Sequence, residues 1–280
     1  MTMDASANRP VREPAVAGAF YPGLPAQLRQ TVERLLVRME EPVSPLALLV
    51  PHAGYVYSGA TAGKAYASSN LPNRLIILCP NHTGLGAPLS CMDRGSWRTP
   101  LGDVPLDANL ASALLGACPD VRVDPTAHLR EHSIEVQLPF LQTYLEGFRF
   151  VPLAVGMQDY DSLAKLGLGL AEVLRAHGGE AAILVSTDMN HYESASENRR
   201  KDDLALNAVK ALDARALHEV CLRERISMCG FAPTVSAIVA ARACGANRAD
   251  VVDYTHSGLI TGDDQQVVSY AAVRIWKDAS

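Results

Sequence analysis

Three short apolar runs, each followed closely by a histidine, constrain this chain more than any other feature. The runs are Leu46–Val50 before His52, Arg74–Cys79 before His82, and Ala181–Thr187 before Asp188 and His191. Short apolar runs bounded by Gly, Pro or Asn are typical of strands that are buried on both faces of an α/β sheet. Ligands of such sheets bind beyond the carboxyl ends of the strands. The pattern therefore predicts a functional site where these three strands end.

The rest of the chain alternates between helical periodicity and further apolar runs. The expected helices are Pro25–Arg38, Ala60–Ser68, Asp107–Ala117, Glu131–Leu145, Asp161–His177, Asn198–Leu212, Ala214–Arg223 and Phe231–Cys244, and the further strands are Phe148–Val155, Ala249–Thr255 and Gln266–Trp276. We expect residues 1–11 to be frayed and residues 12–280 to form a single α/β domain, because no linker or repeat divides them. The alternation predicts a sandwich with a central mixed sheet covered by helices.

His52, His82 and Cys229 are the preferred metal ligands. Imidazole and thiolate suit iron, copper or zinc, and three protein ligands leave one coordination position open. Cys229 precedes a predicted helix, whose N-terminus should favour the thiolate. The alternative is that the three are unrelated core or surface residues.

Asp188 and His191 form a second group, in the stretch STDMNHY. They could act as acid/base partners in which the carboxylate orients the imidazole, or they could add to the metal shell. Asp188 could equally be a helix cap with His191 packed beside it. His256, which ends another strand, could reach the same pocket or could be a turn residue.

The stretch EHSIEVQLPFL lies within the predicted helix Glu131–Leu145, where Pro139 should cause a kink. His132 and Glu135 then fall close to one face of that helix. We interpret Glu131 as a first-turn charge and His132 as a polar group that lines the pocket rather than a ligand.

Charge and cysteine usage narrow the classes of function. A net charge of −5 and a pI near 5.9 argue against binding to nucleic acid or to an anionic membrane surface. The apolar runs are far shorter than the ~20 residues of a membrane-spanning helix. The six cysteines contain no CxxC pair, which indicates reduced thiols and a cytoplasmic protein.

Several motifs together resemble the Memo protein family over nearly the whole chain. The stretches are AVAGAFYPG, PHAGYVYSG, PNHTG, EHSIEVQLPFL, STDMNHY and MCGFAPT. The resemblance implies a fold similar to the class III extradiol dioxygenases of the LigB type. It also implies that His52 and His82 match two histidine ligands, that Cys229 stands where dioxygenases have a carboxylate, and that His191 and Asp188 match the acid/base region.

The resemblance implies a mononuclear pocket for Fe(II) or copper, with zinc as a further option, and redox chemistry on an unknown small substrate. The alternatives are a non-catalytic protein that binds a peptide, and a carrier of copper or iron, each built on a retired dioxygenase site. The family also implies AMMECR1-like and radical-SAM proteins as partners.

Overall fold

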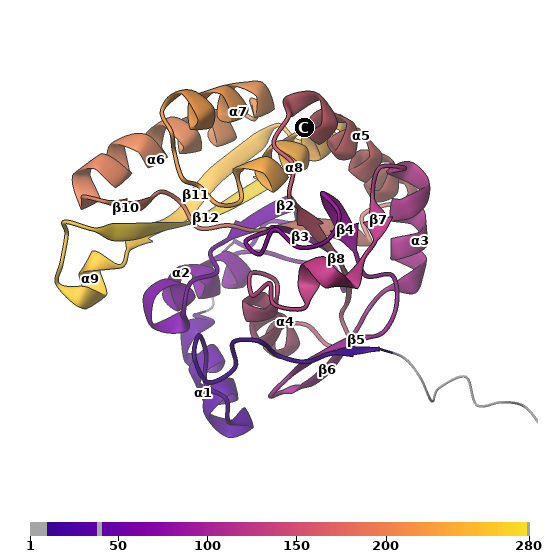
Figure 1. Ribbon diagram of the computed structural model, residues 1–280, viewed down its shortest axis with the longest axis horizontal. Helices are drawn as coiled ribbons and strands as arrows, with labels where there is room; N and C mark the ends of the chain where they lie inside the picture. The colour runs from indigo at the N-terminus through magenta and orange to yellow at the C-terminus, as the bar shows by residue number, and fades with distance from the viewer. Residues whose placement is uncertain (1–9, 38–40, 279–280) are drawn as a thin grey trace, which may run out of the picture.

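The computed structural model describes residues 10–37 and 41–278, and these residues build a large mixed sheet with helices on both faces (Figure 1). Its strands run in the order β10-β12-β2-β9-β3-β8-β4-β7, and β11 pairs with β12 off this path. Their bounds are β2 (Pro45–Val50), β3 (Arg74–Pro80), β4 (Leu89–Cys91), β7 (Arg122–Val123), β8 (Arg149–Val155), β9 (Ala181–Ser186), β10 (His191–Glu193), β11 (Arg248–His256) and β12 (Val267–Trp276).

The centre of this sheet consists of the three strands that the sequence singles out. Strand β9 lies between β2 and β3 and is parallel to both, with Val185 opposite Leu49 on one side and Leu78 on the other. The three strands therefore end at the same edge of the sheet. The histidines and the aspartate that follow them are brought to one place, as predicted.

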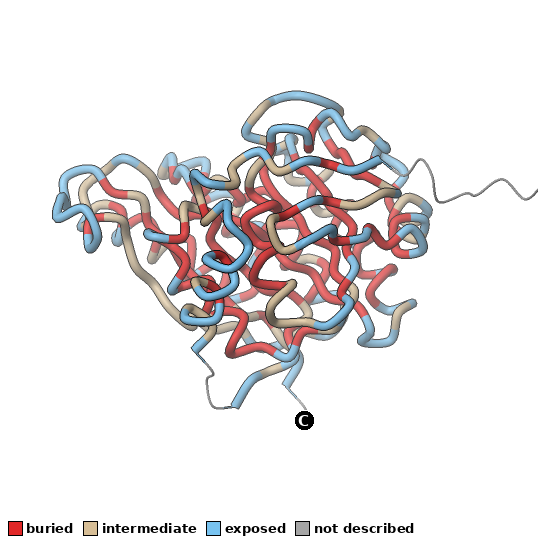
Figure 2. The backbone as a smooth tube through the Cα atoms, turned by 90° about the horizontal axis from the view of Figure 1, so that it is seen from below, coloured by how far each residue is buried: buried red, intermediate tan, exposed pale blue. Residues whose placement is uncertain are grey.

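Helices cover both faces of the sheet. Those on one face are α3 (Ala108–Ala117), α5 (Tyr160–Ala176), α6 (Ala195–Lys210), α7 (Ala214–Arg223) and α8 (Phe231–Ala243), and those on the other are α1 (Pro25–Leu35), α2 (Tyr55–Ala67) and α4 (Leu138–Tyr144). Successive strand residues face opposite sides, so Leu49 packs under the first set and Leu48 under the second. The buried residues accordingly lie along the central part of the backbone, between the exposed segments (Figure 2). No helix in the described part of the chain is long and apolar enough to cross a membrane.

A small second sheet includes the amino-terminal segment and pairs it with residues from later in the chain. It joins β1 (Val11–Arg12), β5 (Ser96–Thr99) and β6 (Gly102–Pro105), and β1 pairs with β5 through Val11 and Ser96. Of the stretch expected to be frayed, residues 1–9 lie outside the described residues, whereas Val11 is held in this sheet. The short helix α9 (Gly258–Thr261) connects β11 to β12.

The helix predicted over Glu131–Leu145 is wrong in its first part. Glu131 and His132 lie in an irregular loop, Ser133 and Ile134 form a turn, and the 3-10 turn Glu135–Gln137 and α4 follow. A second 3-10 turn, Pro125–His128, precedes this segment. Pro139 stands in the first turn of α4, where a missing N–H costs nothing, and so it does not kink a longer helix. His132 and Glu135 consequently do not share a helix face.

Candidate metal centre

His52 is the most deeply buried histidine of the site, and its two ring nitrogens have different partners. Its backbone N–H donates to Asp188 Oδ1 at 2.7 Å, and its Nδ1 lies 3.0 Å from Ser186 Oγ. The Ser186 hydroxyl already donates to the carbonyl of Ser133 at 2.7 Å, so it accepts from His52 Nδ1–H. This arrangement leaves a lone pair on His52 Nε2. Burial, together with the nearby His82, lowers the pKa of His52 to about 3.

His82 is oriented by the carboxylate of Glu131, a residue for which the sequence predicts only a charge in the first turn of a helix. Glu131 is fully buried and accepts both the backbone N–H of His82, at 2.7 Å, and its ring Nδ1–H, at 3.0 Å. A carboxylate behind a histidine fixes the tautomer and the direction of the ring. In the neutral ring of His82 the proton therefore stays on Nδ1 and the lone pair on Nε2.

Two opposing effects act on the Glu131–His82 pair. Burial is the largest single effect and by itself raises the pKa of Glu131 and lowers that of His82, but the hydrogen bond and the charge attraction between them together outweigh it. Ser133 adds a backbone N–H to Glu131 at 3.0 Å and a short hydroxyl contact. The pKa of Glu131 is thus held well below its usual range, that of His82 is raised, and the carboxylate stays ionised behind the ring.

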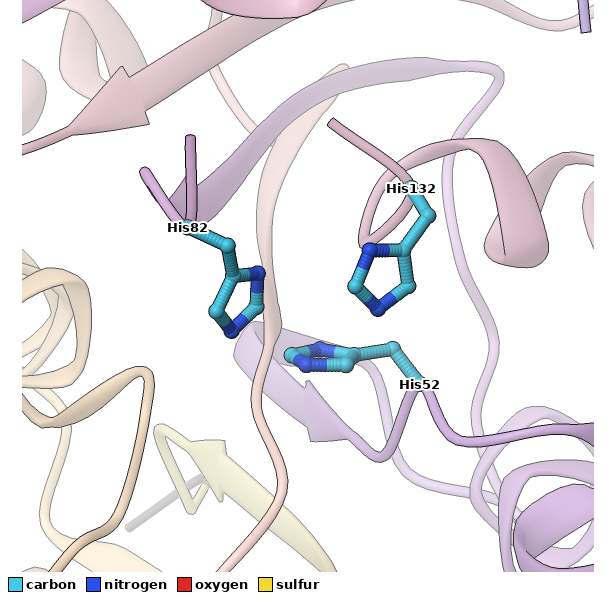
Figure 3. A group of neighbouring side chains, drawn as sticks. All are labelled: His52, His82 and His132. Carbon is cyan, nitrogen blue, oxygen red and sulfur yellow. The ribbon is translucent and has the colours of Figure 1, made fainter. Parts of the chain in front are cut away.

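His132 completes a group of three imidazoles (Figure 3). Its ring is stacked on that of His82 with centroids 5.1 Å apart, and it meets the ring of His52 edge-on at 5.4 Å. One nitrogen from each of the three rings lies within 4.8 Å of the others. Burial and then the charge that His52 could carry lower the pKa of His132 to about 4. His132, expected to line the pocket, is thus close enough to its neighbours to act as a ligand.

Cys229 lies beside this group, in the connection between α7 and α8. Its Sγ is 3.3 Å from His52 Nε2 and accepts the backbone N–H of Asp188 at 3.2 Å. It precedes α8 directly, as predicted. The prediction that Cys229 readily forms a thiolate is wrong for the protein without a metal. Burial and the neighbouring Asp188 raise the pKa of the Cys229 thiol far above its usual value.

Asp188 and His191 both reach the site, but not as a bonded pair. Asp188 Oδ2 lies 3.9 Å from His52 Nε2, and burial raises the pKa of this carboxyl. His191 donates its backbone N–H to Ser227 Oγ at 2.8 Å. Its buried Nδ1 has no hydrogen-bond partner among the residues that the structure describes, so Asp188 does not orient that nitrogen. His256 ends β11 with its Nδ1 3.8 Å from Asp264 Oδ1, outside the imidazole group.

The donor set suits a transition metal. Neutral imidazole is a ligand for iron, copper and zinc, whereas magnesium and calcium prefer oxygen ligands. Burial keeps His52 and His132 neutral near pH 7, and the hydrogen bonds that His52 and His82 make to Ser186 and Glu131 occupy their Nδ1 atoms, so both rings would bind a metal through Nε2. The residues present therefore fit a metal of this class.

Comparison with known proteins places the chain in a family. Residues 12–274 match the model of the Memo-like proteins. The chain belongs to the Memo-like family. A MEMO1 family protein of Aquifex aeolicus is 43% identical over 93% of this chain and 97% of its own length, and one of Methanopyrus kandleri is 41% identical over 94% and 98%.

A solved structure supports the fold. An uncharacterized protein of Escherichia coli K12 superposes with a TM-score of 0.51 at 13% identity, covering 80% of this chain and 98% of its own. At that identity the likeness concerns only the fold. It agrees with the α/β architecture and its large mixed sheet.

Proposed function

We propose that this Memo-like protein binds one transition-metal ion, Fe(II) or copper before zinc, and uses it in redox chemistry on a small substrate. The observation that carries the proposal is the imidazole group of His52, His82 and His132, whose ring nitrogens lie within 4.8 Å of one another. His52 and His82 would hold the metal, and His132 or Cys229 would complete the ligand set. The pocket would then resemble that of the class III extradiol dioxygenases.

The surrounding residues have roles that follow from their contacts. A bound iron or copper ion would supply the redox chemistry. Ser186 and Glu131 orient the rings of His52 and His82 through their Nδ1 atoms. Asp188, with a raised pKa and its Oδ2 3.9 Å from His52 Nε2, and His191, with its unpartnered Nδ1, are the groups that would hold or move a proton.

Elemental analysis of protein purified without oxygen or chelators tests the site. We expect about one metal per chain, as three protein ligands close a mononuclear site. His52→Ala and His82→Ala should each abolish binding, while His177→Ala, at the end of α5, serves as the matched control. Retention of the metal in both pocket variants would disprove the proposal.

The third ligand is decided by a second pair of variants. Co(II) bound through a thiolate shows a sulfur-to-metal charge-transfer band in the near ultraviolet, whereas three imidazoles give none. If Cys229 is the ligand, Cys229→Ser removes the band and His132→Ala leaves it. If His132 is the ligand, the parent protein shows no such band and His132→Ala lowers its affinity.

A further inference from the structure

A cavity of about 440 Å³ opens beside the metal centre, between the segment after β8 and the connection from α7 to α8. Its lining includes Gln158, Arg225, Ser227, Cys229 and Phe231. Cys229 Sγ also lies 3.3 Å from His52 Nε2, so this one residue stands between the cavity and the imidazole group. Its volume is within the range of about 300–1,000 Å³ that small-molecule sites occupy.

Arg225 is the one charged residue among those that line this cavity. In the described part of the chain its side chain makes no hydrogen bond or ion pair. The neighbouring Arg223 differs, because its Nε lies 3.1 Å from Glu224 Oε1. A guanidinium with no partner at a cavity wall leaves its donors available to a ligand.

The backbone at Arg225 adds a second, independent observation. Arg225 has a φ of +52° and follows the C-cap of α7, where it donates its N–H to Leu222, while Ile226 donates to Cys221. This is the Schellman arrangement, whose left-handed position is usually a glycine. The chain thus keeps a long cationic side chain at a position that glycine fits better. Such retained strain is a reason to look for a function in the side chain.

We propose that the substrate of this site is a small molecule that carries a carboxylate or a phosphate, and that Arg225 binds this anionic group. A guanidinium can bind either oxyanion through two parallel N–H donors. The remainder of the molecule would extend along the cavity past Ser227 and Cys229 toward the histidines. The statement about a substrate rests on the proposed function, but the binding of the anion does not need the metal.

The test measures binding to metal-free protein by calorimetry. Benzoate and phenyl phosphate are the anionic probes, which separate carboxylate from phosphate preference, and benzyl alcohol is the neutral control. We expect Arg225→Gln to weaken the preferred anion at least tenfold and to leave benzyl alcohol unchanged. The Arg223→Gln variant changes an arginine two residues away that is ion-paired with Glu224, and it should bind all three probes as the parent does.

Arg225→Gly separates binding from folding. Glycine suits the left-handed backbone, so this variant should be at least as thermostable as the parent and should still lose the anion. Anion binding that survives both Arg225 variants, or anions that bind the parent no better than benzyl alcohol, would overturn the proposal. Metal content is measured on separate samples of the same variants, purified without oxygen or chelators: loss of the anion with the metal retained removes only this inference, and absence of the metal with the anion bound removes only the proposed function.

Discussion

Glu135 offers the sharpest test of how the fold supports the metal centre. Its carboxylate is fully buried and accepts four hydrogen bonds from the amino-terminal segment: from Arg12, Ala15, Val16 and Tyr21. Arg12 in turn donates to the carbonyl of Glu131 at 2.7 Å, so the same network holds the loop that carries Glu131 and His132. We predict that Glu135→Gln severely destabilises the protein.

The magnitude follows from the charges involved. The Arg12–Glu135 ion pair has side-chain exposures of 1% and 0%, so loss of the carboxylate leaves the Arg12 charge buried and uncompensated. Removing one partner of such a pair costs about 3–5 kcal/mol. A domain of this kind is usually stable by about 5–15 kcal/mol. The Glu135→Gln variant should therefore lose a large part of the free energy of unfolding.

Urea unfolding followed by circular dichroism measures this loss. Lys165→Met is the matched control, because the Lys165–Asp120 pair is 61% and 53% exposed and should be worth about 0.2–1 kcal/mol. A double-mutant cycle with Arg12→Met isolates the coupling between the two charges. A loss below about 1 kcal/mol in Glu135→Gln, equal to that of the control, would refute the reasoning.

Two further predictions concern the thiols and the buried histidines. A short iodoacetamide pulse on metal-free protein should label the half-buried Cys244 before Cys229, because burial and Asp188 raise the pKa of the Cys229 thiol far above its usual value. On longer exposure metal should suppress only the Cys229 label; unchanged Cys229 labelling on peptide mapping would exclude it as a ligand. Burial lowers the folded-state pKa of His52 to about 3 and those of His128 and His132 to about 4, below the unfolded value near 6.5. These neutral histidines therefore contribute fully to the free energy of unfolding above pH 6.5, and that contribution is lost as the pH falls toward 4. Urea unfolding of metal-free protein between pH 7.5 and 5 should show this decline, and His128→Asn should make it shallower; an equal slope in that variant would contradict the assignment.

The place of the site could be predicted from the sequence because it depends on local pattern. Each apolar run is long enough for one strand, and the first stops at Pro51, which cannot continue a central strand. Parallel strands then bring their ends together whatever the helices do, which places His52, His82 and Asp188 at one edge.

The supporting residues could not be predicted in this way, because their partners are distant in the sequence. Glu131 looked like a first-turn charge, yet its carboxylate binds His82, 49 residues away, and Glu135 binds Arg12, 123 residues away. Glu131 also accepts the N–H of Ser133, and side-chain bonds of this kind compete with helix formation. The predicted helix therefore starts later, and the freed turn is what carries His132 to the other two rings.

Cys229 shows why a local rule about charge can fail in the folded protein. The N-terminus of α8 favours a thiolate, but that effect is modest, typically about 0.3–1 kcal/mol at an exposed helix end. Burial of the sulfur and the carboxylate of Asp188 both disfavour the negative charge, and they win in the protein without a metal. A thiol that stays protonated beside His52 Nε2 becomes a good ligand only when a cation is there to offset the charge. The same surroundings that keep the Cys229 thiol protonated in metal-free protein thus make any thiolate ligation specific to the metal-loaded state.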